Sequence, residues 1–297
     1  MGPTAENLTS EKRQADFKAK KQKAHEKSFD SLQRIHAVIF ALAIGEAVKR
    51  ILTIDDSTHT VKPLVEYLPQ FFTLILTIIP FYHGSHRHFD DRYVFNERPV
   101  NGKYFLFFEL LACLLTACVF FWLSLAIKEE AFFYILTGML AFNCVWGLIA
   151  WAVHGAGTWK WSTINIFTVA IFLSILFPLP LYFGNVAATA FHLLPLAIIF
   201  FWDILRAGWE FFHAMRPSEQ YRKVGTLAPV HLRTIILLSL FTAVIILIVW
   251  LFYWCSEAPW HDAIRQGAFL FVAAFRTFFD YYWRWNFYFP EVDGAES

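Results

Sequence analysis

The residues best suited to chemistry lie between positions 82 and 93, where three histidines, two aspartates and two arginines occur. Imidazole nitrogens are good ligands for transition metals, and carboxylate oxygens can complete a metal site. His83, His86 and His88 follow an HxxHxH pattern, and His154 is expected at a similar depth. A transition-metal site built from these four histidines is therefore an alternative prediction. The leading prediction for the segment involves no metal and no cofactor.

The same segment combines cations with aromatic rings, which suits phosphate groups and lipid headgroups. The side chains predicted to contact such a ligand are His83, His86, Arg87, His88 and Arg92. We expect an anionic small molecule or a protein regulator to bind here from the cytosolic side. The excess of basic residues in the cytosolic loops of membrane proteins explains much of the same pattern, so a purely topological role is the alternative.

Ionisable residues inside apolar segments form a second group of candidates. They are Glu46, Lys49, Arg50, Glu109, Arg276, Asp280 and Arg284. Charged groups in a membrane interior are costly unless they are paired or hydrated, and they commonly mark ion or substrate pathways. The spacing of Glu46 and Arg50 suits a helical ion pair, and the last three residues share one helical stripe. We predict that these side chains line a polar conduit; local pairing of each group is the alternative.

The elements that must position these residues are strongly apolar. The chain has 297 residues, of which 57% are hydrophobic and 16% are charged, against about 25% charged in ordinary soluble domains. This composition excludes a disordered chain, a collagen, a coiled coil and an ordinary soluble domain. The net charge of +1 gives no argument for nucleic-acid binding, and the four cysteines form no CxxC pair that would indicate zinc.

Seven apolar runs are long enough to cross a hydrocarbon core about 30 Å thick as helices. They cover residues 35–54, 64–83, 104–127, 131–153, 162–181, 186–205 and 232–255. Residues 263–289 carry a narrow charged stripe on an otherwise apolar helix, which favours an eighth span facing protein or water. A helix lying on the outer membrane surface is the alternative. The predicted fold class is an all-α polytopic transmembrane helical bundle with seven or eight spans.

Most lysines and arginines outside these runs lie on the same predicted side as the N-terminus, which places the N-terminus in the cytosol. We expect a charged cytosolic extension over residues 1–31, a transmembrane bundle over 32–289 and a C-terminal tail over 290–297. The expected location is the cell membrane, as a multi-pass protein of a bacterial-type inner membrane. Because the charged stripes need partners or water, we also expect a homo-oligomer surrounded by membrane lipid.

These features favour a gated pore or channel-like effector that an anionic ligand or a partner protein controls from the cytosolic face. The alternative is a membrane-embedded metalloenzyme that acts on a lipid or apolar substrate through His83, His86 and His88. A third hypothesis is a secondary transporter with Glu46 and Glu109 as proton or substrate sites. The sequence contains no GxxxxGK[ST] or HExxH motif, so no catalytic residue is assigned and a non-enzymatic role is favoured.

Overall fold

A computed structural model describes residues 5–52, 64–90, 102–154, 159–176 and 260–289, together with the isolated positions Val244 and Ile248. Every regular element in these ranges is helical, and none of the described residues forms a strand. The longer helices are α1 (Ala5–Leu52), α2 (Leu68–Phe89), α3 (Gly102–Leu125), α4 (Ala131–His154), α5 (Trp159–Leu176) and α9 (His261–Trp283). The short helices are η1 (Leu64–Tyr67), before α2, and α10 (Trp285–Tyr288), after α9. The all-helical class is therefore confirmed for the described part of the chain.

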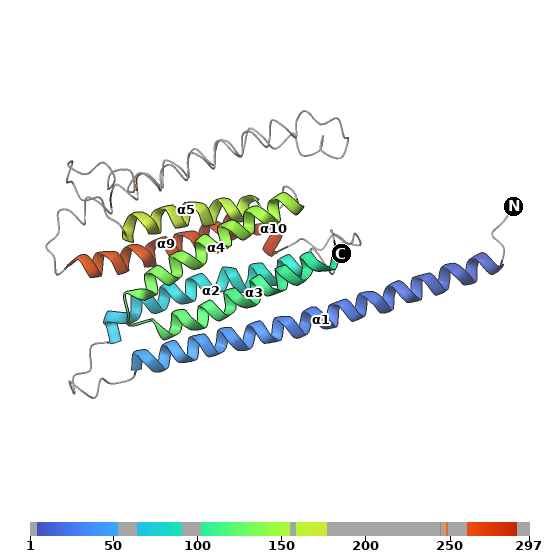
Figure 1. Cartoon of the computed structure of the whole chain (residues 1–297), viewed down its shortest axis with the longest axis horizontal. Helices are drawn as coiled ribbons and strands as arrows, with labels where there is room; N and C mark the ends of the chain where they lie inside the picture. The colour runs from blue at the N-terminus through green and yellow to red at the C-terminus, as the bar shows by residue number, and fades with distance from the viewer. Residues whose placement is uncertain are drawn as a thin grey trace, which may run out of the picture.

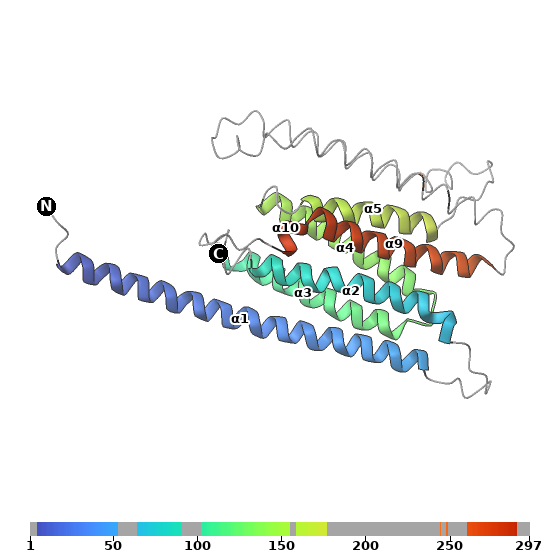
Figure 2. The same cartoon turned by 180° about the vertical axis from the view of Figure 1, so that it is seen from behind.

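Helix α1 is much longer than the bundle against which it packs. It has 48 residues, or about 72 Å at 1.5 Å per residue, and its N-terminal half extends beyond the other helices (Figure 1). The view from behind shows the same projection (Figure 2). Its buried stripe begins at His36 and continues through Phe40, Ala43 and Ala47, with the spacing of one helical face. The charged extension and the first apolar run are thus parts of one continuous helix.

Two of the described helices are long and apolar enough to cross a membrane. They are the 20-residue stretches Leu106–Leu125 of α3 and Ala131–Ala150 of α4. Helix α5 contributes a shorter apolar stretch, Lys160–Leu176. The helices that contain the predicted spans 35–54, 64–83 and 263–289 are not among these two, and the predicted spans 186–205 and 232–255 lie outside the described residues, so seven or eight spans stays a prediction.

Aromatic contacts hold the helices together in two groups. Phe120 of α3 contacts Phe40 of α1 and Phe81 of α2 edge-on, with ring centroids 5.3 and 5.5 Å apart. Phe269 of α9 lies 4.5 Å from Phe133 of α4 and 4.2 Å from Phe172 of α5. Such tilted and edge-on pairs are the preferred packing of aromatic rings in a core.

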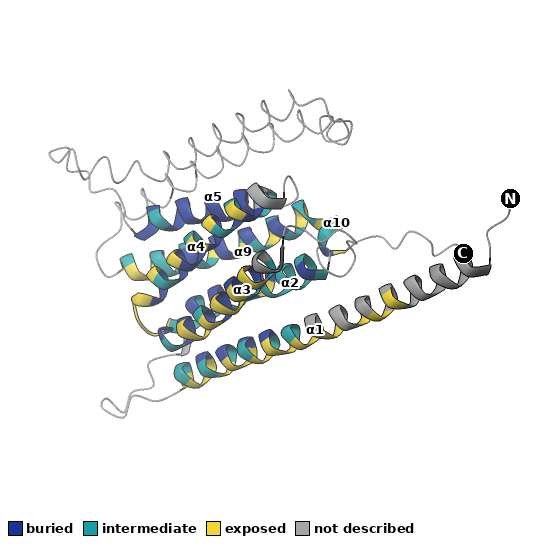
Figure 3. Cartoon of the chain, turned by 45° about the vertical axis from the view of Figure 1, so that its right-hand side comes forward, coloured by how far each residue is buried: buried dark blue, intermediate teal, exposed yellow. Residues whose placement is uncertain are grey.

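The outer faces of α3 and α4 remain apolar. In Figure 3 the buried positions of α1 and α3 face the other helices, and their exposed positions follow the outer side of the ribbons. The exposed side chains include Phe108, Leu115 and Trp122 of α3, and Phe142 and Val145 of α4. Exposed apolar surface of this extent is typical of a surface covered by lipid or by another protein.

Consecutive helices run in opposite directions, so residues far apart in sequence meet at the same end of the bundle. At one end, Gln33 hydrogen-bonds to Asp90, and Lys160 reaches the last carbonyl of α9, that of Trp283. We call this the His83 end. At the opposite end, Arg265 of α9 pairs with Glu130, between α3 and α4, at 2.6 Å. We call this the Glu130 end.

Helix α9 lies within the bundle, against α2 and α5 (Figure 1). Its buried residues are Phe269, Val272, Ala273, Arg276 and Asp280. The chain then turns at Arg284, and α10 folds back against α2, where Tyr288 lies close to Gly84. In the described structure this segment therefore packs against the other helices; whether it spans a membrane stays a prediction.

Candidate functional site

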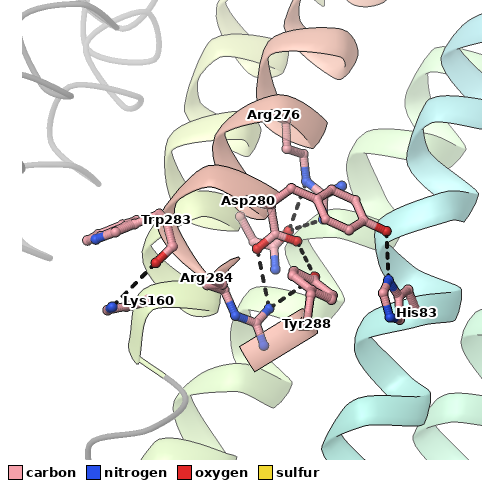
Figure 4. A network of polar contacts seen from close by, with 9 residues as sticks. His83, Lys160, Arg276, Asp280, Trp283, Arg284 and Tyr288 are labelled. Atoms are coloured by element: carbon pink, nitrogen blue, oxygen red, sulfur yellow. Dashed lines mark hydrogen bonds and ion pairs between the residues drawn. The ribbon is translucent and has the colours of Figure 1, made fainter. Parts of the chain in front are cut away.

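The charged stripe of α9 becomes a buried polar cluster at the His83 end. Arg276, Asp280 and Arg284 are four residues apart, so they lie along one face of the helix. Asn165 of α5 and Tyr288 of α10 complete this group, which we call the α9 cluster. Figure 4 labels Arg276, Asp280, Arg284 and Tyr288. Arg276 is only 3% exposed and Asp280 is fully buried. The residues predicted as a stripe are thus brought together with partners from two other elements.

Asp280 is the acceptor at the centre of the α9 cluster. The Tyr288 hydroxyl donates to Asp280 Oδ2 at 2.6 Å, and Arg284 Nη1 donates to Oδ1 at 3.3 Å. The turn at Arg284 makes this possible, because the backbone N–H of Tyr288 bonds to the Arg284 carbonyl and α10 bends back. Both carboxylate oxygens of Asp280 therefore accept a hydrogen bond inside the bundle.

Arg276 is bound by a neutral amide rather than by a carboxylate. Its Nε and Nη2 donate to Asn165 Oδ1 at 3.3 and 2.9 Å, and the Phe81 ring covers the guanidinium at 5.0 Å. Arg276 Nη1 and Asn165 Nδ2 are both buried and find no hydrogen-bond partner among the described residues. Buried donors are nearly always satisfied, so these two atoms need an explanation.

Side chains of α2 and α5 hold the end of α9 and α10 in place. His83 Nδ1 lies 3.0 Å from the Tyr281 hydroxyl (Figure 4), and its ring lies 4.7 Å from that of Tyr288. Arg87 Nε donates to the Phe287 carbonyl at 3.0 Å, and Lys160 Nζ lies 3.4 Å from the Trp283 carbonyl. Carbonyls at a helix C-terminus lack intrahelical partners, and cations commonly satisfy them.

A second group, which we call the histidine cluster, joins α1, α2 and α3 and consists of His36, His86, His88 and Glu109. The rings of His36 and His86 are stacked with centroids 6.4 Å apart, and their Nε2 atoms find no partner in the described part of the chain. His88 Nε2 pairs with Glu109 Oε1 at 3.1 Å, and Glu109 is 1% exposed. Two stacked imidazoles and one histidine–carboxylate contact thus lie where α1 enters the bundle.

Two groups near the end of α2, beyond the predicted span 64–83, have perturbed acidities. Burial, helped by the nearby His36 and His83, lowers the pKa of His86 to about 4. Burial also raises the pKa of Asp90, although Arg87 and the hydrogen bond from Gln33 oppose that shift. The His86 imidazole is therefore neutral at physiological pH.

The three histidines of the HxxHxH pattern face different neighbours. His83 contacts α9 and α10, His86 stacks on α1, and His88 pairs with α3. His86 and His88, two residues apart, point to nearly opposite sides of α2, whereas His83 and His86, three apart, share one face and differ because α1 and α10 approach that face at different places. No group of three or more His, Cys, Asp or Glu side chains in the described ranges is arranged to hold a metal. The side chain of His154, and Arg92 as a whole, lie outside what the structure describes.

Glu46 belongs to a separate, local arrangement on α1. Its carboxylate accepts a hydrogen bond from Arg50 Nε at 3.0 Å and lies 3.6 Å from Lys49 Nζ. The Lys49 side chain is 74% exposed. Within one chain, the described contacts therefore distribute the candidates over three places: this triplet, the histidine cluster and the α9 cluster. Local pairing, the alternative to a shared conduit, describes the Glu46 triplet.

Tyr288 was not among the residues selected from the sequence. The signal was available, because the four-residue spacing of Arg276, Asp280 and Arg284 continues to position 288. The spacing does not by itself indicate a polar role for Tyr288, because a tyrosine in an aromatic-rich segment normally indicates packing or a membrane interface. Asn165 gave still less signal, since a single polar residue in an apolar helix has many possible partners.

Comparison with known proteins finds no matching family model, no matching curated protein and no matching solved structure.

Proposed function

We propose that this chain is an integral membrane protein of seven or eight spans that acts as a gated, channel-like effector. Its N-terminus lies in the cytosol, its location is a bacterial-type inner membrane, and it assembles as a homo-oligomer. An anionic ligand or a partner protein controls it from the cytosolic face. The apolar outer faces of α3 and α4 support an environment of lipid.

The proposed orientation is supported by the distribution of polar groups along the bundle. The charged half of α1 projects beyond the His83 end (Figure 1), where Arg87 and Lys160 also lie. Basic residues collect on the cytosolic side of membrane proteins, so the His83 end is the proposed cytosolic mouth. A ligand arriving from the cytosol would meet a positively charged rim there.

The observation that carries the proposal is the buried Arg276. A bundle of apolar helices does not need a fully enclosed guanidinium for its stability, and ionisable residues among membrane helices commonly mark pathways. Arg276 Nη1 has no hydrogen-bond partner among the described residues, so it can donate to a further ligand. Asp280 and Arg284 lie one and two turns further toward the proposed mouth and continue the row of polar side chains inside the bundle.

Conductance of the purified full chain in planar lipid bilayers tests the proposal. We expect single-channel currents from the wild type, and altered conductance or ion selectivity for Arg276→Gln. Arg276→Lys keeps the charge and should retain the wild-type selectivity, while Glu46→Gln removes a locally paired group and should behave as wild type. Electrical silence of the folded wild type with and without anionic lipids or nucleotides would refute the channel.

The metalloenzyme and transporter hypotheses predict different results in the same preparation. A metalloenzyme built on His83, His86 and His88 would contain stoichiometric iron, zinc or manganese, and its described histidines would have to leave their present partners. A secondary transporter using Glu46 and Glu109 would show proton-driven uptake into vesicles without single-channel steps. Elemental analysis and a proton-gradient uptake assay therefore separate these functions from a channel.

A further inference from the structure

Helix α9 carries an exposed apolar stripe along its whole length. The stripe consists of six exposed residues, Trp260, Gly267, Phe271, Ala274, Phe278 and Tyr282. They are three, four or seven residues apart, so they follow one face of the helix. The four aromatic side chains among them are between 55% and 71% exposed, and none of the six residues is charged. An apolar surface of this length is normally covered by lipid or by another protein.

The buried charges of α9 lie on the opposite side of the helix from this stripe. Arg276 lies two residues before Phe278 and Asp280 two residues after it, which is a rotation of about 200° on a helix with 3.6 residues per turn. Both charged side chains are buried against the bundle. A helix lying on a membrane surface turns its charged face toward water instead. The charges of α9 therefore face protein, and the side that faces outward is apolar.

The ends of the stripe are spaced like the two interfaces of a bilayer. Trp260 and Tyr282 are 22 residues apart, or about 33 Å at 1.5 Å per residue. The hydrocarbon core of a bilayer is about 30 Å thick, and Trp and Tyr side chains collect at both of its interfaces. Polar or aromatic exposed residues continue beyond each end, with Asp262 beside Trp260 and Trp285 beside Tyr282. This match in length favours lipid over a protein partner as the cover of the stripe.

We propose that α9 crosses the membrane and that its exposed stripe contacts the lipid acyl chains. Trp260 lies at the interface of the Glu130 end, Tyr282 at the interface of the His83 end, and Phe271 at the middle of the bilayer. The inference rests on the proposed membrane location and adds to it the side of α9 that faces lipid. The α9 cluster is then separated from lipid by the width of one helix, and α9 forms no subunit interface in the homo-oligomer.

Electron paramagnetic resonance of nitroxide labels measures the depth of each position in phospholipid vesicles. The labels are attached to Trp260→Cys, Phe271→Cys, Phe278→Cys and Tyr282→Cys, each in a full chain whose four native cysteines are replaced by alanine. Depth is obtained from the ratio of collisions with oxygen, which enters the hydrocarbon core, to collisions with a nickel chelate, which stays in water. We expect Phe271 to lie about 16 Å deeper than Trp260 and Tyr282, because it is 11 residues from each. Lys27→Cys, on the projecting half of α1, is the exposed reference and should report water.

A second measurement keeps the native cysteines. A photoreactive p-benzoylphenylalanine in place of Phe271 should form, on illumination in vesicles, an adduct that adds the mass of one lipid to the chain. Phe269 is the matched control, because it lies two residues away and is fully buried. The same replacement there should give no lipid adduct.

Equal depths at the four labelled positions would overturn the proposal in favour of a helix lying on the surface. Exclusion of both oxygen and nickel from the stripe, or an adduct between two chains at Phe271, would overturn it in favour of a second copy as the cover. The expected depth profile in a protein that never conducts would reject the channel and retain the span. Conduction by a protein with equal depths would reject the span and retain the channel.

Discussion

Replacement of Tyr288 by phenylalanine removes a hydroxyl that donates to Asp280 and also accepts a longer hydrogen bond, from Arg284 Nη1 at 3.4 Å. The hydroxyl donates to Asp280 Oδ2 at 2.6 Å, in a site where both side chains are almost completely buried. The ring, which contacts His83 and Tyr281, is retained, so packing changes little. A hydrogen bond to a charged group contributes about 1.5–3 kcal/mol. We expect Tyr288→Phe to lower the free energy of unfolding by that amount.

Equilibrium unfolding of detergent-solubilised protein, followed by tryptophan fluorescence, measures this loss. Tyr282→Phe is the matched control, because Tyr282 lies near the end of α9, on the same helix as Asp280, and is 71% exposed. A double-mutant cycle with Asp280→Asn should give a coupling free energy of about 1 kcal/mol or more, since the two groups contact each other directly. Equal stability of Tyr288→Phe and Tyr282→Phe, or additivity with Asp280→Asn, would refute the assignment.

Three further predictions concern other parts of the bundle. A Cβ at Gly147 would lie 2.9 Å from Trp161 and even closer to Ser162, so Gly147→Ala should lower the free energy of unfolding by about 1–3 kcal/mol. The control is Gly138→Ala, because a Cβ at Gly138 meets no atom, and it should not reduce the melting temperature. Glu46→Gln breaks a partly exposed local ion pair and should cost less than about 1 kcal/mol in chemical unfolding. The pKa of His86 is lowered to about 4 in the folded protein, so between pH 6.5 and 4 the unfolded chain binds a proton that the folded one does not, and stability falls with pH over that range. The accompanying fall in melting temperature should be smaller in His86→Gln.

Two of the described helices, α3 and α4, follow the hydrophobic pattern closely, whereas α2 (Leu68–Phe89) begins four residues and ends six residues after the predicted run 64–83. The runs 104–127 and 131–153 correspond to α3 (Gly102–Leu125) and α4 (Ala131–His154), within about two residues at each end. Such agreement is expected, because long apolar runs have one stable backbone geometry in a nonpolar environment. The sequence predicts a frayed helix over the charged residues 1–31 that leads into the first span, and α1 is a single helix from Ala5 to Leu52.

The candidate site was predictable in its residues but not in its partners. Periodicity alone places Arg276, Asp280 and Arg284 on one stripe. It does not say that Asn165 faces Arg276, because that contact depends on the packing of α5 against α9 over a separation of 111 residues. The HxxHxH pattern, similarly, cannot reveal that each histidine faces a different helix, since the neighbouring helices are set by tertiary packing.

The local pairing seen within one chain has a consequence for any gating mechanism. If the proposed channel conducts along the α9 cluster, Asp280 must exchange Tyr288 for water or for a permeant ion, and the hydrogen bond between these side chains would then stabilise the closed arrangement. Tyr288→Phe should then raise the open probability as well as lower stability, because it removes an interaction that exists only in the closed state. Single-channel recording measures this directly, with Tyr282→Phe again as the control. If Tyr288→Phe reduces stability while the open probability stays at the wild-type value, the α9 cluster is a structural element of the bundle and the gate lies elsewhere.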